Sequence, residues 1–174
     1  KGSMQFMAMN DGEINNTELV AMLVSCGDTI LEGIQKVQDQ VQGSLTLLIL
    51  TKDGLYAARD KMGRTPMIIG KKDDAICAAS ESFAFINIGY NKVKELGPGE
   101  IVLLTKDSVQ TLSAPREEMR ICTFLWSYFG YTTSTYEGVN VEAMRCRNGG
   151  LLANRDQRDP LLVDVDYVAG VPDS

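Results

Sequence analysis

The stretch from Ser44 to Phe85 constrains the fold of this chain of 174 residues most strongly, because it alternates short apolar runs with turn residues. Lys52-Asp53-Gly54 has the Asp-Gly sequence that favours a hairpin turn, since glycine accepts a positive φ without a steric penalty. Lys71–Asp74 has the polarity of a second turn. The stretch therefore predicts an antiparallel meander. Its expected strands are Leu45–Leu50, Leu55–Ala58, Met67–Ile69 and Ile76–Ala79, with a polar loop over Arg59–Pro66.

Two amphipathic helices are predicted before this stretch. Asn15 or Asn16 is a good N-cap for the first helix, which should end near Gly27. Asp28 or Thr29 caps the second. Apolar residues recur in it at helical spacing as far as Gly43: Ile30, Leu31, Ile34, Val37 and Val41. Helices followed by antiparallel strands predict an α+β fold, a layered sheet with helices on one face.

The stretch is followed by further strand signals and then by a predicted domain boundary. Ser82–Gly89 fits either a helical turn or a strand. A Gly-Pro-Gly turn cluster then leads into the expected strands Ile101–Thr105 and Val109–Leu112. Ser113–Glu118 contains a proline and three charges, as linkers between domains often do. We therefore predict one domain over residues 1–118 and the beginning of a second over residues 119–174.

The second predicted domain contains three kinds of segment. Ile121–Tyr131 is dense in aromatic side chains, which usually pack in a core. Tyr136–Asp156 is predicted to be a helix, although Gly149-Gly150 should weaken it. Asp164–Ser174 is predicted to be an apolar strand. Parallel sheets need several strands covered on both faces, so a lone strand indicates that the chain holds only the start of this domain.

Composition excludes several classes of function. The chain has no histidine, which removes Ser-His-Asp and Cys-His nucleophiles and metals bound through histidine. Its net charge of −6 argues against nucleic acid and anionic membranes as partners. Its apolar runs are too short to span a bilayer. The four cysteines lack CxxC spacing, which fits a reducing, cytoplasmic setting.

Several motifs in this chain resemble those of the amidophosphoribosyltransferase family, class II glutamine amidotransferases joined to a type I phosphoribosyltransferase. That family has Ala-Arg-Asp, Gly-x-Arg-Pro, a strand ending in Gly, and Ser-Glu-(Thr/Ser). The matching residues here are Ala58-Arg59-Asp60, Gly63, Pro66, Gly70 and Ser80-Glu81-Ser82. Arg64 stands one place earlier than the arginine of the family. The aromatic segment from Cys122 and the ending Val-Pro-Asp-Ser resemble later segments of the same family.

The resemblance implies both a fold and an activity. Residues 1–118 would be the later part of a glutaminase domain of the N-terminal-nucleophile type, and residues 119–174 the start of an α/β phosphoribosyltransferase domain. The complete protein would hydrolyse glutamine with an N-terminal cysteine whose own amino group is the base. The ammonia would displace pyrophosphate from phosphoribosyl pyrophosphate and give phosphoribosylamine, the first step of purine synthesis. The resemblance also implies Mg²⁺ as cofactor and a homo-oligomer.

The resemblance also assigns candidate binding residues. Asn16 stands where the family has an aspartate that holds the amino group of glutamine; the neutral amide should bind it more weakly, and a simple helix cap is the alternative. Arg59 and Asp60 would brace loops near the glutaminase pocket, with a purely structural ion pair as the alternative. Asp173 and Ser174 match the Pro-Asp-Ser-Gly loop of the phosphoribosyl site.

Cys122 matches a cluster ligand in the iron–sulfur-bearing branch of the family. The other ligands would lie beyond Ser174, so no cofactor is expected on these residues alone. No residue is assigned a catalytic role, because the chain starts with Lys1 and has no Cys-Gly-x-x-Gly opening. We therefore expect an inactive fragment of a longer enzyme. A catalytically silent relative that serves nucleotide sensing or assembly is one alternative. Another class II amidotransferase, acting on sugar phosphates or forming asparagine, is a second, and the Pro-Asp-Ser ending counts against it.

Overall fold

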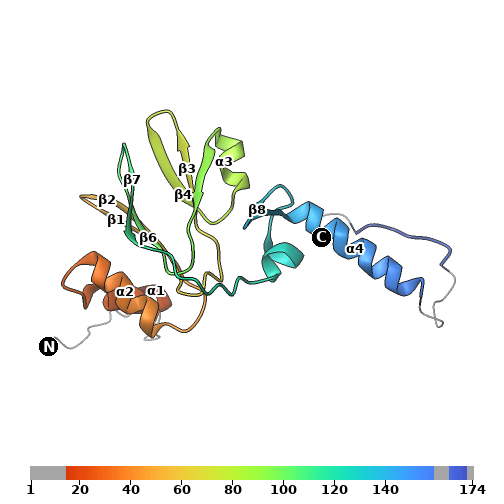
Figure 1. Ribbon diagram of the computed structural model, residues 1–174, viewed down its shortest axis with the longest axis horizontal. Helices are drawn as coiled ribbons and strands as arrows, with labels where there is room; N and C mark the ends of the chain where they lie inside the picture. Colours follow the sequence, from red (N-terminus) through yellow and green to blue (C-terminus); the bar gives the residue numbers. More distant parts are fainter. Residues whose placement is uncertain (1–14, 159–164, 172–174) are drawn as a thin grey trace.

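The computed structural model describes residues 15–158 and 165–171, and its elements follow the chain as helices, then strands, then a helical C-terminal part (Figure 1). The helices are α1 Asn16–Ser25, α2 Ile30–Gln40, α3 Phe83–Ile88, the π-helix η1 Leu125–Phe129 and α4 Val141–Asp156. The strands are β1 Thr46–Thr51, β2 Gly54–Arg59, β3 Ile68–Lys72, β4 Ala75–Ala79, β5 Asn91–Glu95, β6 Ile101–Leu104, β7 Val109–Ser113, β8 Thr135–Tyr136 and β9 Val139–Asn140.

The first seven strands form two antiparallel sheets. One sheet has the order β1-β2-β6-β7 and the other the order β4-β3-β5. The predicted strands are present, but the prediction of a single meander is wrong, because the two hairpins belong to different sheets. The polar loop after Arg59 carries the chain from one sheet to the other, and the free edge of β2 pairs with β6 instead of β3.

Alternating side chains of β2 and β6 face two different layers. Ala58 and Ile101 point to one side and form a buried cluster with Ile34 of α2. Ala57 and Val102 point to the other side and pack against the second sheet. Burial of each larger aliphatic side chain contributes about 1.5–3 kcal/mol. The result is a stack of helices, sheet and sheet, which we call the layered core (residues 15–113), and it matches the predicted layered α+β class.

Two glycines allow the hairpins β1–β2 and β3–β4 to pack closely against neighbouring elements. Gly54 ends the predicted Asp-Gly turn with φ of 140°, and a Cβ there would lie 2.4 Å from the Leu104 carbonyl oxygen. Gly70 in β3 lies beneath Phe85 of α3, and a Cβ there would lie 2.9 Å from its ring. Gly54 adopts a backbone conformation that glycine favours, and Gly70 leaves room for the Phe85 ring because it has no side chain.

The ends of the helices settle the alternatives that the sequence left open. Asn15 caps α1, because its side chain accepts from the Thr17 amide at 2.8 Å. Thr29 caps α2 in the same way, through the Glu32 amide at 3.2 Å. The segment after Ser82 is the helix α3. Strand β5 was not predicted, because its one apolar residue gives no alternating pattern.

The aromatic segment after residue 121 differs from its prediction. Trp126 is buried and meets Tyr136 edge-on at 5.8 Å between ring centroids. The expectation of a core is wrong for the other four aromatics, which are 57–75% exposed: Phe124, Tyr128, Phe129 and Tyr131. A single helical turn such as η1 offers only one face to a neighbouring element, so its remaining side chains point outward.

Helix α4 begins later than predicted and lies away from the sheets (Figure 1). Residues 135–140 form the hairpin β8–β9, and Asn140 then caps α4 by accepting from the Ala143 amide at 3.0 Å. The Gly-Gly pair does not interrupt the helix. None of the helices in the described ranges is long and apolar enough to cross a membrane.

Residues 165–171 do not form the predicted strand. Their apolar side chains are exposed, among them Val165, Tyr167 and Val168. A strand needs a partner for its backbone groups, and within the described residues β-pairing involves only the sheets named above. Asp173 and Ser174 lie outside the described residues. β7 ends at Ser113, where the predicted domain boundary starts, and the division into two domains stays a prediction.

Candidate functional site

The predicted pair Arg59-Asp60 lies at the corner where the chain leaves the first sheet. Arg59 is the last residue of β2, and Asp60 begins the loop toward β3. Arg59 is 0% exposed and Asp60 is 3% exposed. A buried guanidinium and a buried carboxylate both need polar partners, and each of these side chains finds its own set.

Arg59 spreads its donors over four acceptors. Its Nε donates to the Thr65 carbonyl at 2.8 Å and its Nη2 to the Gly63 carbonyl at 2.8 Å. Its Nη1 donates to the Leu96 carbonyl and to Oε1 of Glu137, the latter at 2.7 Å. The ion pair of Arg59 is therefore with Glu137 and not with Asp60, and both side chains have structural partners.

Asp60 holds the loop that follows it. Its carboxylate accepts from the backbone amides of Met62 at 3.1 Å, Arg64 at 3.1 Å and Thr65 at 3.5 Å. Its own carbonyl accepts from Gly63 at 3.0 Å. These are the contacts of a bracing residue, which the resemblance implies. In this conformation neither Arg59 nor Asp60 reaches the surface, so a direct contact with substrate stays a prediction.

Helix α2 is tied to the same corner by Gln38. This side chain is 4% exposed, and its Nε2 donates to the carbonyl oxygens of Arg59 at 2.7 Å and Gly99 at 3.2 Å. The helical spacing of apolar residues in α2 does not single out a buried glutamine, so this contact could not be predicted from the sequence. It fixes the helix layer against the end of β2.

Asn16 lies at a different place, at the start of α1. Here α1 and the edge strand β1 border an open pocket of about 320 Å³, lined by Asn16, Thr17, Val20, Leu45, Thr46, Leu47 and Leu48. Arg59 and Asp60 are not among its lining residues. The structure thus separates the candidate substrate-binding residues into an open pocket at Asn16 and a buried corner at Arg59.

The lining of this pocket is polar at the helix start and carries no formal charge. Asn16 and Thr17 are exposed in the first turn of α1; the Thr17 amide is bonded to Asn15, and Glu18 places a carboxylate in the same turn. Asn16 adds no charge of its own. The lining residues offer hydrogen bonds to a primary amide, whereas an ammonium group finds no full countercharge among them.

Cys122 lies in the C-terminal part and packs against the cluster around Trp126. It is half-buried, and its amide donates to the Arg64 carbonyl at 3.0 Å. In the part of the chain that the structure describes, no three acidic, cysteine or histidine side chains converge as metal ligands. The role of Cys122 as a cluster ligand stays a prediction.

Residues 134–137 form a contact with the layered core that the sequence did not indicate. Ser134 Oγ donates to Glu81 Oε2 at 2.6 Å, and the Thr135 amide donates to Ser82 Oγ at 2.8 Å. Burial raises the pKa of the Tyr136 hydroxyl above its ordinary value, and the nearby Glu81 carboxylate raises it further. The Ser-Glu-Ser motif after β4 thus contacts the hairpin β8–β9. In the sequence, the glycine of Glu137-Gly138 is the signal for the turn of this hairpin, and both residues adopt positive φ.

Known proteins resemble this chain along most of its length. A family model described as a glutamine amidotransferase domain matches residues 3–87. The curated amidophosphoribosyltransferase of Archaeoglobus fulgidus is 28% identical over 170 residues, which cover 97% of this chain and 36% of the relative. That of Bacillus subtilis is 30% identical, with 95% and 35% covered, and that of Staphylococcus aureus is 33% identical, with 92% and 32% covered.

Solved structures agree with these relatives. The glutamine phosphoribosylpyrophosphate amidotransferase from B. subtilis, complexed with ADP and GMP, superposes with a TM-score of 0.77 at 29% identity and covers 94% of this chain and 36% of that chain. A second structure, described as the allosteric regulatory enzyme of purine biosynthesis, has a TM-score of 0.77 at 30% identity. In sequence and in fold, the chain matches the amidophosphoribosyltransferase family.

The comparisons confirm the predicted family and fold class. The chain spans about a third of the length of the amidophosphoribosyltransferases that it matches. Its two sheets and helices have the fold of a family member, a glutaminase-type layered structure followed by further segments. The binding roles that the resemblance assigned along the chain stay predictions, and two of the residues concerned lie outside the described ranges.

Proposed function

We propose that this chain is part of a glutamine-dependent amidophosphoribosyltransferase, in which ammonia from glutamine displaces pyrophosphate from phosphoribosyl pyrophosphate to give phosphoribosylamine. The observation that carries the proposal is similarity over 92–97% of the chain to proteins with that name, at 28–33% identity. Since the chain spans about a third of those relatives, the activity belongs to the complete protein.

Within that protein, the layered core is proposed to supply part of the glutamine site. Asn16 would contact the bound glutamine from the first turn of α1, with the 320 Å³ pocket beside it. The neutral amide of Asn16 would hold the ammonium group of the substrate weakly. Arg59 and Asp60 would act indirectly, by bracing the loop of residues 60–65.

The nucleophile of the proposed reaction is not among these residues. None of the four cysteines stands in a Cys-Gly-x-x-Gly sequence, and the reaction requires a cysteine activated by an adjacent base. We therefore propose that the chain of 174 residues does not hydrolyse glutamine by itself. Mg²⁺, an iron–sulfur cluster, a homo-oligomeric state and a cytoplasmic setting are likewise proposals for the complete protein.

A second candidate is a catalytically silent member of the family that serves nucleotide sensing or assembly. The specific observation that favours it is Asn16, which stands where the family has a charged residue for the amino group of glutamine. A silent protein would have no need of that charge. The amidotransferase remains the better supported function, because the similarity extends across the layered core and the C-terminal part alike.

The two candidates differ in a direct assay. The complete gene product is incubated with glutamine, Mg²⁺ and phosphoribosyl pyrophosphate, and glutamate and pyrophosphate are measured together. The amidotransferase should release both in equal amounts, and omission of phosphoribosyl pyrophosphate should abolish pyrophosphate release. Release of neither product would refute the amidotransferase and leave the silent relative. The isolated chain of 174 residues, assayed in parallel, should release no glutamate.

A further inference from the structure

The C-terminal segment, residues 121–156, has a small core of its own. Leu125, Trp126, Tyr136 and Val141 bury one another. Arg145 of α4 adds polar bonds inside the same segment: it donates to the carbonyl oxygens of Trp126 at 2.7 Å, Gly130 at 2.9 Å and Tyr128 at 3.2 Å. Its helices and its hairpin are therefore held together without help from the layered core.

The contacts between this segment and the layered core are mainly polar. The hairpin β8–β9 meets Glu81 and Ser82 through Ser134 and Thr135, and the Glu137 amide donates to Oε1 of Glu95 at 3.1 Å. The Phe83 amide donates to Ser134 Oγ at 3.3 Å, and the Cys122 amide donates to the Arg64 carbonyl at 3.0 Å. Phe83 also stacks on Tyr131 at 4.4 Å between ring centroids, which is an apolar contact. Interfaces of this polar kind resemble those between domains that move relative to one another.

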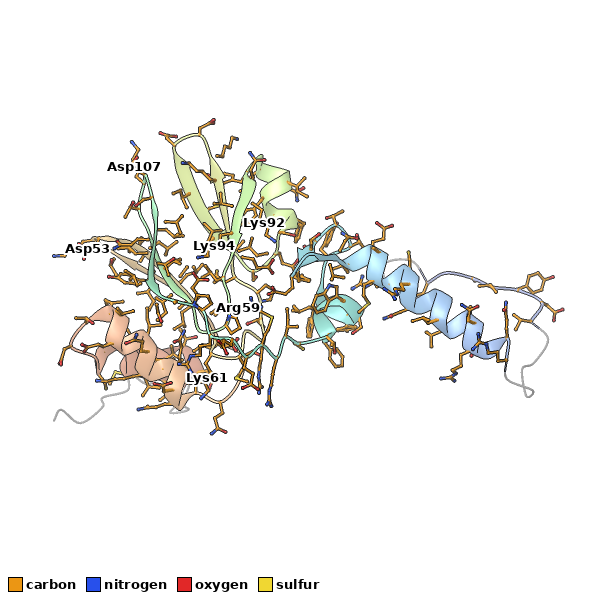
Figure 2. The ribbon with its side chains drawn as sticks, in the orientation of Figure 1. Asp53, Arg59, Lys61, Lys92, Lys94 and Asp107 are labelled. Carbon is orange, nitrogen blue, oxygen red and sulfur yellow. The ribbon has the colours of Figure 1, made fainter. Side chains whose placement is uncertain are left out.

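Arg59 places a fully buried charge at this interface. Three of its four hydrogen bonds go to carbonyl oxygens of the layered core, and the fourth goes to Glu137. Among residues 15–158 and 165–171, Glu137 is the one acidic side chain that forms an ion pair with Arg59. The layered core thus contains a fully buried cation, Arg59 (labelled in Figure 2), whose countercharge is supplied by the C-terminal segment.

Glu137 is also held in a costly backbone conformation. Its φ is 47°, in the left-handed region that residues with a side chain seldom adopt, and Gly138 follows with φ of 77°. Such conformations persist where surrounding contacts enforce them. Here the side chain is fixed by Arg59 and the amide by Glu95, so the turn that aims the carboxylate at Arg59 is stabilised by the contact itself.

We propose that the Arg59–Glu137 ion pair attaches the C-terminal segment to the layered core, and that the segment detaches as a folded unit when the pair is lost. Arg59 is then a positioning residue for the neighbouring segment. Its side chain keeps its three carbonyl partners in the detached state, and the segment keeps its own core. The proposal concerns residues of this chain alone and does not depend on the proposed enzymatic activity.

Residue-resolved amide hydrogen exchange on the chain of 174 residues tests this proposal with the variant Glu137→Gln. The Thr135 amide reports attachment, because its partner is Ser82 in the layered core. The amides of Gly130 and Ala143 report the folding of the segment, because their partners, Leu125 and Asn140, lie within it. Emission from Trp126, the one tryptophan of the chain, gives a second measure of the segment core.

Glu137→Gln should accelerate exchange at Thr135 about tenfold, since a neutral acceptor bonds a guanidinium less strongly; tenfold corresponds to about 1.4 kcal/mol. Exchange at Gly130 and Ala143 and the emission maximum should not change. Glu117→Gln is the matched control, because Glu117 is exposed and forms no ion pair within the described residues. Unchanged exchange at Thr135 would overturn the proposal. So would acceleration of all three amides together, because the segment would then not be an independent unit.

Discussion

Replacement of Asp60 by asparagine tests whether this residue braces the loop between the two sheets. The carboxylate accepts bonds of 3.1 Å from the amides of Met62 and Arg64, and a longer bond from Thr65. A hydrogen bond to a charged group contributes about 1.5–3 kcal/mol, against about 0.5–1.5 kcal/mol for a neutral one. In Asp60→Asn the two short bonds become neutral, and the new amide group faces backbone donors. We therefore expect a loss of about 2–3 kcal/mol in the free energy of unfolding.

Urea denaturation followed by circular dichroism measures this loss. With an m-value of about 2 kcal/mol/M, the midpoint should fall by about 1–1.5 M. Asp107→Asn is the matched control, since Asp107 is exposed beyond the end of β6 (Figure 2), and its replacement should change the free energy by less than about 0.5 kcal/mol. Equal midpoints for both variants would refute the bracing role.

Three further predictions address the core, the pocket and the buried phenol. Ile34→Ala should lower the free energy of unfolding, measured by urea denaturation, by about 2–5 kcal/mol, because Ile34 is 0% exposed between α2 and the first sheet. Leu50→Ala is the control at a residue 82% exposed and should lower it by less than about 0.5 kcal/mol. Similar losses in both variants would contradict the layer assignment. Asn16→Asp should lower the KM of the complete protein for glutamine about tenfold by adding a countercharge for the ammonium group, and an unchanged KM would show that Asn16 only begins the helix. Burial raises the pKa of Tyr136 above its usual value of 10, so the unfolded chain loses this proton at a lower pH than the folded chain does. The free energy of unfolding should therefore fall as the pH rises past about 10. Tyr136→Phe should reduce that fall, and an identical fall in the variant would contradict the burial of this phenol.

Local features of the fold could be predicted from the sequence because short-range physics determines them. The turn before Gly54, the caps at Asn15 and Thr29, and the apolar face of α2 each depend on residues within a few positions of one another. The distribution of the strands over two sheets could not be predicted in this way. It depends on the pairing of β2 with β6, which is separated from it by more than forty residues, and no turn motif specifies it.

The candidate site shows the same division. Motif resemblance singled out Arg59 and Asp60, but it could not identify Glu137 as the partner of Arg59, because the pair is separated by 78 positions in the chain. The exposed aromatics of the C-terminal segment were misassigned to a core for a related reason. Their composition is that of a buried segment, and their exposure depends on which neighbours the fold provides.

The transfer of labelled nitrogen tests the central claim most directly. The complete gene product is supplied with phosphoribosyl pyrophosphate, Mg²⁺ and glutamine labelled with ¹⁵N in its amide group, and the phosphoribosylamine formed is trapped and analysed by mass spectrometry. If this chain is part of an amidophosphoribosyltransferase, the label should appear in the trapped amine in proportion to the pyrophosphate released. Complete absence of label from the product, with the protein folded and both substrates bound, would contradict it.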